Sequence, residues 1–192
     1  MYTKTNNNYT KKYLNFNKII GVFIWVAIFI VAPIFLAISF NKSMFYVSVS
    51  SNSMAPTIEE GDKIIVSKID SKDEIQRNDI IIFYSQELGR MLIKRVVGIP
   101  GDRILIDENF NLKINGEYII ENSNVNFEDS YTYEGNIQNK EIVVPNEAYF
   151  VIGDNNNNSL DSRFWKDKFV LKDLIVGKAL ILFSPIKKFS IF

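Results

Sequence analysis

An apolar run of 22 residues, from Ile19 to Phe40, constrains the fold of this chain more than any other feature. As a single α-helix rising about 1.5 Å per residue, the run would extend about 33 Å, which matches the roughly 30 Å hydrocarbon core of a bilayer. Pro33 lies inside the run, and membrane-spanning helices tolerate a proline kink. The sequence therefore predicts a transmembrane helix over residues 19–40, preceded by a short segment, 1–18, and followed by one domain, 41–192.

The charges that flank the run predict its orientation. The first 42 residues contain five lysines and no acidic residue, and of these lysines only Lys42 follows the run. Because lysines are retained on the cytoplasmic side, we expect a cytoplasmic amino terminus, a single pass and an extracytoplasmic main domain. A cleaved secretory signal is the alternative, since Ala37 and Ser39 resemble the small-x-small pattern of a cleavage site. The apolar core of a cleaved signal usually has only about 7–15 residues, which favours the uncleaved anchor.

Composition excludes several kinds of chemistry. The chain contains no histidine and no cysteine, so disulfides, thiol nucleophiles, zinc–thiolate sites and a Ser-His-Asp triad are ruled out. No cluster of carboxylates suggests a magnesium or calcium site, and we expect neither a metal nor a cofactor. The last 150 residues carry 17 basic and 22 acidic side chains, a net charge of −5, which argues against a nucleic-acid partner.

After the apolar run, short apolar segments alternate with turn signals, which predicts a mostly β, antiparallel domain. Asn115-Gly116 between two apolar segments indicates a two-residue hairpin, and residues 115–140 are a candidate small cap or surface loop. A short helix is expected near Lys166–Leu174. The last ten residues are interpreted as a frayed final strand, or alternatively as a segment that rests at a membrane interface. The predicted strands are Phe45–Val49, Lys63–Ser67, Asp79–Tyr84, Met91–Val97, Arg103–Ile106, Glu141–Val144, Ala148–Ile152 and Val176–Phe183.

Ser53 and Lys94 are the candidate reactive pair. A serine hydroxyl needs a neighbouring base to take its proton, and without histidine the best candidate is an amine in an apolar strand. On such a strand Lys94 shares its face with Leu92 and Val96. Burial there, together with the like charge of Arg95, should lower the pKa of Lys94 and favour the neutral amine. Taken singly, however, Ser53 fits any turn and Lys94 fits a strand lysine that extends its head to solvent.

Four sequence segments, which include Ser53 and Lys94, follow one another along the chain in a characteristic order. The chain reads SNSMAPTI at 51–58, RNDIIIF at 77–83, IKRVVGIPGD at 93–102 and GDNNNNSLDSR at 153–163. Behind an amino-terminal anchor, this series resembles the bacterial type I signal peptidases over essentially the whole chain. The resemblance implies a serine endopeptidase with a signal-peptidase-like β fold that cuts signal peptides from exported preproteins at the outer face of the membrane.

The resemblance also implies a role for individual residues. Ser53 matches the nucleophile and Lys94 the general base, while Ser51 matches a hydroxyl that assists the oxyanion and Ser159 one that orients the lysine. Asp161 and Arg163 match a charged pair that holds the last motif, which includes Gly153 and Asp154, beside the site. The positions that match the apolar pockets for small substrate side chains are Met54, Ile58, Val47, Val49, Leu92 and Ile93.

Two departures and two alternatives accompany this interpretation. Asn52 stands where glycine is often found, and Asn156 replaces a common arginine. For Asp161 and Arg163 the plainer interpretation is a surface ion pair. A soluble self-cleaving repressor would have a DNA-binding domain where this chain has its apolar run, and a non-catalytic scaffold would not need Ser53 and Lys94. We expect a monomer whose partners are signal peptides and membrane lipid.

Overall fold

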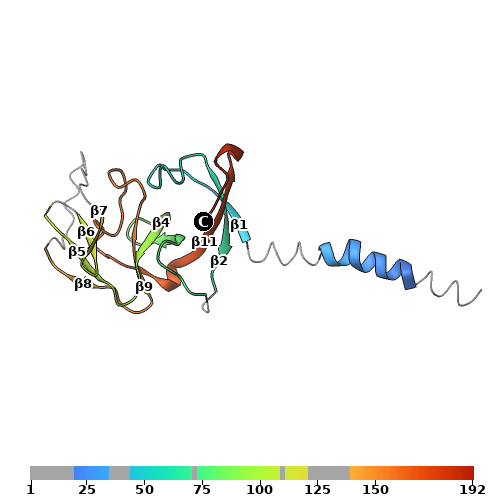
Figure 1. The fold of residues 1–192 in the computed structure, drawn as a ribbon, viewed down its shortest axis with the longest axis horizontal. Coiled ribbons are helices and arrows are strands. Elements are labelled where there is room, and N and C mark those ends of the chain that lie inside the picture. The colour runs from blue at the N-terminus through green and yellow to red at the C-terminus, as the bar shows by residue number, and fades with distance from the viewer. Residues whose placement is uncertain (1–19, 35–43, 71–72, 109–110, 121–138) are drawn as a thin grey trace, which may run out of the picture. The chain divides into compact units, whose positions relative to one another are not determined.

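The computed structural model describes residues 20–34, 44–70, 73–108, 111–120 and 139–192 (Figure 1). The chain divides into two compact units, Met1–Ser43 and Met44–Phe192. The described part of the first unit is a helix over residues 20–34 that is π-helical over Ala27–Val31. Among the described residues, no helix combines the length and the apolar character needed to cross a membrane. The predicted span 19–40 is therefore not confirmed, and its residues 19 and 35–40 lie outside the described part.

The second unit consists mainly of short strands. They are β1 (Met44–Ser48), β2 (Lys63–Lys68), β3 (Ile80–Ser85), β4 (Arg90–Gly98), β5 (Arg103–Ile106), β6 (Leu112–Ile114), β7 (Glu117–Ile120), β8 (Ile142–Val143), β9 (Ala148–Ile152), β10 (Val170–Leu171), β11 (Ile175–Ser184) and β12 (Ser190–Ile191). Two 3₁₀ turns, η2 (Lys172–Leu174) and η3 (Ile186–Lys188), flank β11.

The strands form two antiparallel sheets. The larger runs in the order β1-β2-β11-β3-β4-β9-β10, with β12 paired to β11, and the smaller runs β7-β6-β5-β8. Figure 1 shows β5 to β8 gathered at one end of the second unit and β1, β2 and β11 at the other. The predicted mostly β fold is thus confirmed, while the insertion of the late strand β11 between β2 and β3 has no local sequence signal.

Strands β3 and β9 are mainly apolar because each buries both faces over most of its length. On β3, Ile80 and Ile82 enter one core cluster, whereas Ile81 and Phe83 enter a second. All five residues of β9 are buried, with alternate residues in the second cluster and in a third beside the smaller sheet. Since side chains alternate along a strand, β4 can carry a polar group into the protein interior between such clusters.

The local predictions can be compared with the structure. The hairpin is confirmed, because Asn115 and Gly116 have φ of 53° and 88° between β6 and β7, as such a turn requires. The helix predicted near Lys166–Leu174 is wrong, since strand β10 and the single turn η2 occupy its second half. The tail turns back through η3 and ends as β12 against β11. Residues 121–138 of the predicted loop lie outside the described part.

Candidate active site

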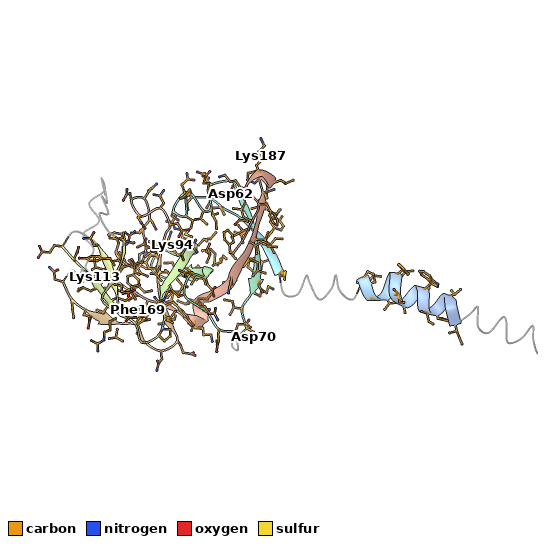
Figure 2. All side chains as sticks on the ribbon, viewed as in Figure 1. Asp62, Asp70, Lys94, Lys113, Phe169 and Lys187 are labelled. Carbon is orange, nitrogen blue, oxygen red and sulfur yellow. The ribbon has the colours of Figure 1, made fainter. Side chains whose placement is uncertain are left out.

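Ser53 and Lys94 meet in the structure. Ser53 lies in the loop between β1 and β2, just before the cis bond Ala55–Pro56, and Lys94 lies in the middle of β4. Lys94 Nζ forms a 2.6 Å hydrogen bond with Ser53 Oγ. Lys94 is only 2% exposed, and Figure 2 shows it in the interior of the second unit, whereas Lys187 lies at the edge. The contact therefore joins a half-buried hydroxyl to an almost fully buried amine.

The surroundings of Lys94 favour its neutral form. Burial, partly opposed by the Asp161 carboxylate, lowers the pKa of Lys94 from 10.5 to about 8, and the positive charges of Arg90 and Arg163 contribute. The predicted direction is right, but Arg95 is not among the charges that mainly lower this pKa. The Arg95 guanidinium forms two hydrogen bonds with the Asp154 carboxylate, 2.8 and 2.6 Å long, and its charge is compensated there.

Backbone contacts fix the loop that carries Ser53. The Ser53 carbonyl accepts a 3.1 Å hydrogen bond from the Asn155 N–H, and the Asn155 side chain donates to the Asn52 carbonyl at 3.0 Å. A Cβ added at Gly153 would lie 2.3 Å from the Ser53 carbonyl oxygen and 2.2 Å from Ser159 Oγ. Only a glycine lets the two segments approach this closely. The turn after β9 therefore serves as the support against which the Ser53 backbone rests.

Asp161 and Arg163 form a buried ion pair behind this turn. Two 2.9 Å hydrogen bonds join their side chains, both of which are fully buried. The Asp161 carboxylate also accepts a 3.0 Å bond from the Gly153 N–H, and the Arg163 guanidinium donates to the Asn156 carbonyl at 3.1 Å. The alternative of a surface ion pair is wrong, because neither side chain reaches solvent. The pair connects the 161–163 segment directly to Gly153.

The two other candidate hydroxyls differ in their contacts. Ser51 Oγ lies 3.5 Å from Ser53 Oγ in the exposed part of the loop. Ser159 is 1% exposed, and among the described residues its Oγ has no hydrogen-bond partner, so it does not bond to Lys94 in this structure. Asn52 is not among the residues with positive φ, and its side chain accepts a 2.9 Å bond from the Glu60 N–H. Glycine is thus not required at position 52.

Five of the six candidate pocket residues come together in one place. Val49, Met54 and Ile58 belong to the first core cluster, with Val47 and Ile93 packed against it. Met54 and Ile58 are 1% and 0% exposed, so they lie beneath the surface of the site. Leu92 packs against the second cluster, on the other face of β4. The alternation of side chains along β4 explains this separation of Leu92 from Ile93.

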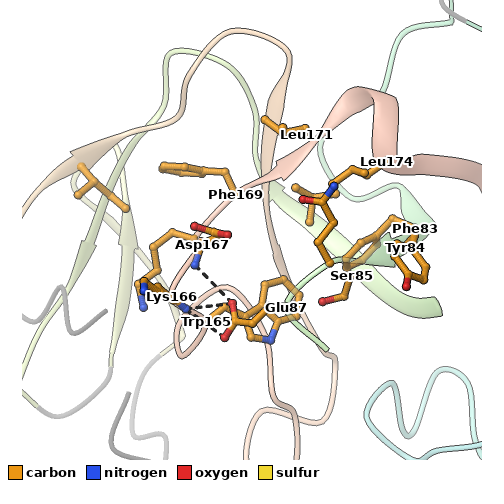
Figure 3. A pocket seen from close by; sticks show the side chains of 14 residues that line it. Phe83, Tyr84, Ser85, Glu87, Trp165, Lys166, Asp167, Phe169, Leu171 and Leu174 are labelled. Carbon is orange, nitrogen blue, oxygen red and sulfur yellow. Dashed lines mark hydrogen bonds between the residues drawn. The ribbon is translucent and has the colours of Figure 1, made fainter. Parts of the chain in front are cut away.

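A pocket and a buried lysine outside the Ser53–Lys94 contact have no distinguishing signal in the sequence. A pocket of about 510 Å³ lies between the β3–β4 hairpin and residues 165–171, and its walls include neither Ser53 nor Lys94 (Figure 3). Lys168 contributes to this pocket and is only 7% exposed, and burial lowers its pKa to about 8. We place the chemistry at the Ser53–Lys94 contact because a nucleophile and a base must be in hydrogen-bond reach.

In the described part of the chain, no group of three or more histidine, cysteine or acidic side chains is placed to hold a metal ion.

An amine with a pKa of about 8 next to a hydroxyl can accept the hydroxyl proton at moderately alkaline pH. The oxygen then becomes a nucleophile toward a carbonyl carbon. This arrangement suits acyl transfer through a serine ester, without a metal or a histidine.

Comparisons with known proteins show which proteins the chain resembles. A family model described as signal peptidase, peptidase S26, matches residues 21–184. Signal peptidase I U of Bacillus subtilis (strain 168) is 35% identical over 143 residues, which cover 71% of this chain and 74% of that protein. The probable signal peptidase I-2 of Synechocystis sp. is 31% identical over 147 residues, 73% of this chain but only 63% of that longer protein.

Among solved structures, a signal peptidase I from Enterococcus faecalis V583 is 32% identical, with a TM-score of 0.40. The superposition covers 56% of this chain and 98% of that one.

Proposed function

The chain belongs to the signal peptidase family of serine endopeptidases, peptidase S26, and from this membership we propose that it removes amino-terminal signal peptides from exported preproteins, with Ser53 as nucleophile and Lys94 as general base. The observation that carries the proposal is the 2.6 Å hydrogen bond between Ser53 Oγ and Lys94 Nζ. It joins the hydroxyl to an amine whose pKa burial lowers to about 8.

The proposed reaction has two stages. Neutral Lys94 takes the proton of Ser53 as Oγ attacks the carbonyl carbon of the scissile peptide bond. The tetrahedral intermediate then collapses, the Lys94 ammonium gives its proton to the departing amine, and the signal peptide remains as an ester on Ser53. Water attacks this ester, again with Lys94 as the base, and releases the signal peptide and free Ser53.

Groups around Ser53 would stabilise the oxyanion and orient the base. The Ser53 N–H and the Ser51 hydroxyl are the proposed donors to the oxyanion, supported by the 3.5 Å separation of the two serine oxygens. Ser159 is the proposed orienting hydroxyl for Lys94, since its buried Oγ lies against Gly153 next to the Ser53 backbone. The Asp161–Arg163 pair would hold this segment in place through the Gly153 N–H.

The apolar residues beside Ser53 would select small side chains of the substrate. Val47, Val49 and Ile93 would form the wall, and the buried side chains of Met54 and Ile58 would form a floor that leaves only a shallow recess. Leu92 packs against the second cluster, on the face of β4 that it shares with Lys94, so it would not belong to this wall.

We also infer that the apolar run 19–40 anchors the protein in the bacterial plasma membrane. The length of the run and the excess of lysines before it support a single pass with a cytoplasmic amino terminus. Ser53 follows the run by 13 residues, a distance of at most about 45 Å when extended, so the site would stay near the membrane where signal peptides emerge. Anchoring enzyme and substrate in the same bilayer raises their effective concentration, and a monomer suffices.

Cleavage of a purified preprotein in detergent tests the proposal. The full chain should release the mature protein with a single new amino terminus, identified by mass spectrometry. Ser53→Ala should abolish the release, while Ser48→Ala, at an exposed serine on β1, should leave it unchanged. An intact preprotein with the wild-type chain, or full cleavage by Ser53→Ala, would contradict the proposal.

A further inference from the structure

A series of buried polar contacts runs from Lys168 to the reactive serine. Lys168 Nζ donates a 3.0 Å hydrogen bond to the Arg163 carbonyl. The Arg163 side chain pairs with Asp161, which in turn accepts the Gly153 N–H. Gly153 lies against the Ser53 carbonyl, where even one added carbon atom would come within 2.3 Å of the oxygen. Each contact shares a residue with the next, so the series is continuous from Lys168 to Ser53.

The Arg163 carbonyl lies in a tight turn. The Asp161 carbonyl accepts hydrogen bonds from the Phe164 N–H at 2.8 Å and from the Trp165 N–H at 3.2 Å. Lys168 therefore bonds to the middle of the same turn whose first residue supplies the buried carboxylate. Trp165, which ends the turn, packs edge-on against Phe83 of β3 with ring centroids 5.9 Å apart. The turn is held by β3 on one side and by the Lys168 ammonium on the other.

Burial of Lys168 costs free energy, because its ammonium group loses contact with water. Its side chain is 7% exposed, although a lysine normally keeps its ammonium in water. The charged groups that act on it are Glu87 and Asp161, both of which favour the ammonium form but less strongly than burial opposes it. Lys166, two residues earlier, is exposed, and its backbone N–H bonds to the Glu87 carboxylate (Figure 3). The two lysines thus share a segment but differ in burial.

We propose that Lys168 is a positioning residue for the dyad: by holding the Arg163 carbonyl it fixes the turn that carries the Asp161–Arg163 pair, and through Gly153 it fixes the backbone that supports Ser53. This inference rests on the proposed function of Ser53 and Lys94. Lys168 touches neither the substrate nor the reacting atoms. Its loss should therefore lower kcat through misplaced groups at the site and leave KM nearly unchanged.

Steady-state cleavage of a preprotein by the full chain in detergent tests this inference. Lys168→Met keeps the apolar length and removes the donor, Lys168→Arg keeps a charged donor, and Lys166→Met removes a charge from the same segment as a matched control. We expect Lys168→Met to lower kcat at least tenfold with KM within twofold of wild type. Lys168→Arg should recover at least a third of the wild-type kcat, and Lys166→Met should retain all of it. Thermal melting of each variant shows whether it is folded at the assay temperature.

Each outcome of these assays either supports or overturns the positioning role of Lys168. A folded Lys168→Met variant as active as Lys166→Met overturns the inference, as does a folded Lys168→Arg variant no better than Lys168→Met. If Lys168→Met does not fold, Lys168→Gln replaces it, and a folded Gln variant with wild-type kcat overturns the inference while a reduced kcat supports it. If neither neutral variant folds, Lys168 serves the fold and not the dyad. Absence of cleavage by the wild-type chain, or cleavage by Ser53→Ala, would instead overturn the proposed function.

Discussion

The proposed reactivity of Ser53 depends on how one lysine is buried. Lys94 emerges from β4 among apolar neighbours, and desolvation outweighs the attraction of Asp161 and Asp154 for its ammonium form. Arg90 and Arg163 act in the same direction as burial. A lysine with an ordinary pKa near 10.4 would be almost fully protonated at neutral pH, and a hydroxyl beside it would have no base. In the proposed mechanism, the environment of a single amine thus decides whether Ser53 can act.

The pH dependence of cleavage follows from this environment. The protonated amine is inactive, so kcat/KM should fall about tenfold per pH unit below the pKa of Lys94, which is about 8, and level off above it. Arg90→Gln removes a positive charge that lowers this pKa, and the rising limb should move to higher pH. Arg103→Gln, at an exposed arginine in β5, is the control and should leave the limb in place. A profile that is flat between pH 6 and 9 would exclude Lys94 as the base.

Gly153 is the residue at which a single added carbon should do the most damage. In Gly153→Ala the new Cβ would collide with the Ser53 carbonyl and with Ser159, and backbone must move to relieve it. We expect at least a hundredfold loss of kcat/KM and a loss of stability of about 1–3 kcal/mol. Gly89→Ala is the matched control. It has open space but a φ of 62°, so it should cost about 1–2 kcal/mol of stability without affecting cleavage. Equal activity of the two variants would show that the close approach is unimportant.

At the scale of elements, the proposed site is supported by an ion pair within the segment between β9 and β10. Because Asp161 and Arg163 are fully buried, removing one partner leaves an uncompensated charge in the interior. Arg163→Met should therefore destabilise the protein by about 3–5 kcal/mol, measured by urea unfolding. The exposed pair Arg103–Glu141 provides the comparison, and Glu141→Gln should cost less than about 1 kcal/mol. Similar costs for the two changes would mean that the buried pair is not structural.

How far the sequence predicts these elements depends on the range of the interactions. The strands were predictable because alternation and apolar runs are local, and β3 and β4 lie within two residues of their predicted bounds. The helix expected near Lys166–Leu174 fails because β9 recruits Val170 and Leu171 as a partner strand. The pairing of Arg95 with Asp154 joins residues 59 positions apart, and the burial of Lys168 depends on the turn at Arg163. Such long-range contacts leave no local signal, so the candidate dyad and the Asp161–Arg163 pair were accessible from motifs, but the partner of Arg95 and the burial of Lys168 were not.

At the scale of the whole molecule, the proposed anchor predicts which parts of the chain lie outside the cell. If the run anchors the chain with its amino terminus inside, protease added to intact cells should remove epitopes in residues 60–192 and spare an epitope in residues 2–12. The cells are first treated with a mild denaturant that unfolds the outer domain, since a folded β domain can resist proteolysis. Protection of both ends would contradict the orientation. A mature protein that begins near Phe40 would show that the run is a cleaved signal.

The central claim is that Lys94 removes the proton of Ser53. The most direct measurement is kcat/KM for preprotein cleavage by Lys94→Arg, which keeps a long cationic side chain but supplies a group that does not deprotonate in proteins. The account predicts a variant that folds and still binds a signal peptide, yet is as inactive as Ser53→Ala. Substantial turnover by Lys94→Arg would show that Lys94 contributes only its charge, and the assignment of the serine–lysine dyad would be contradicted.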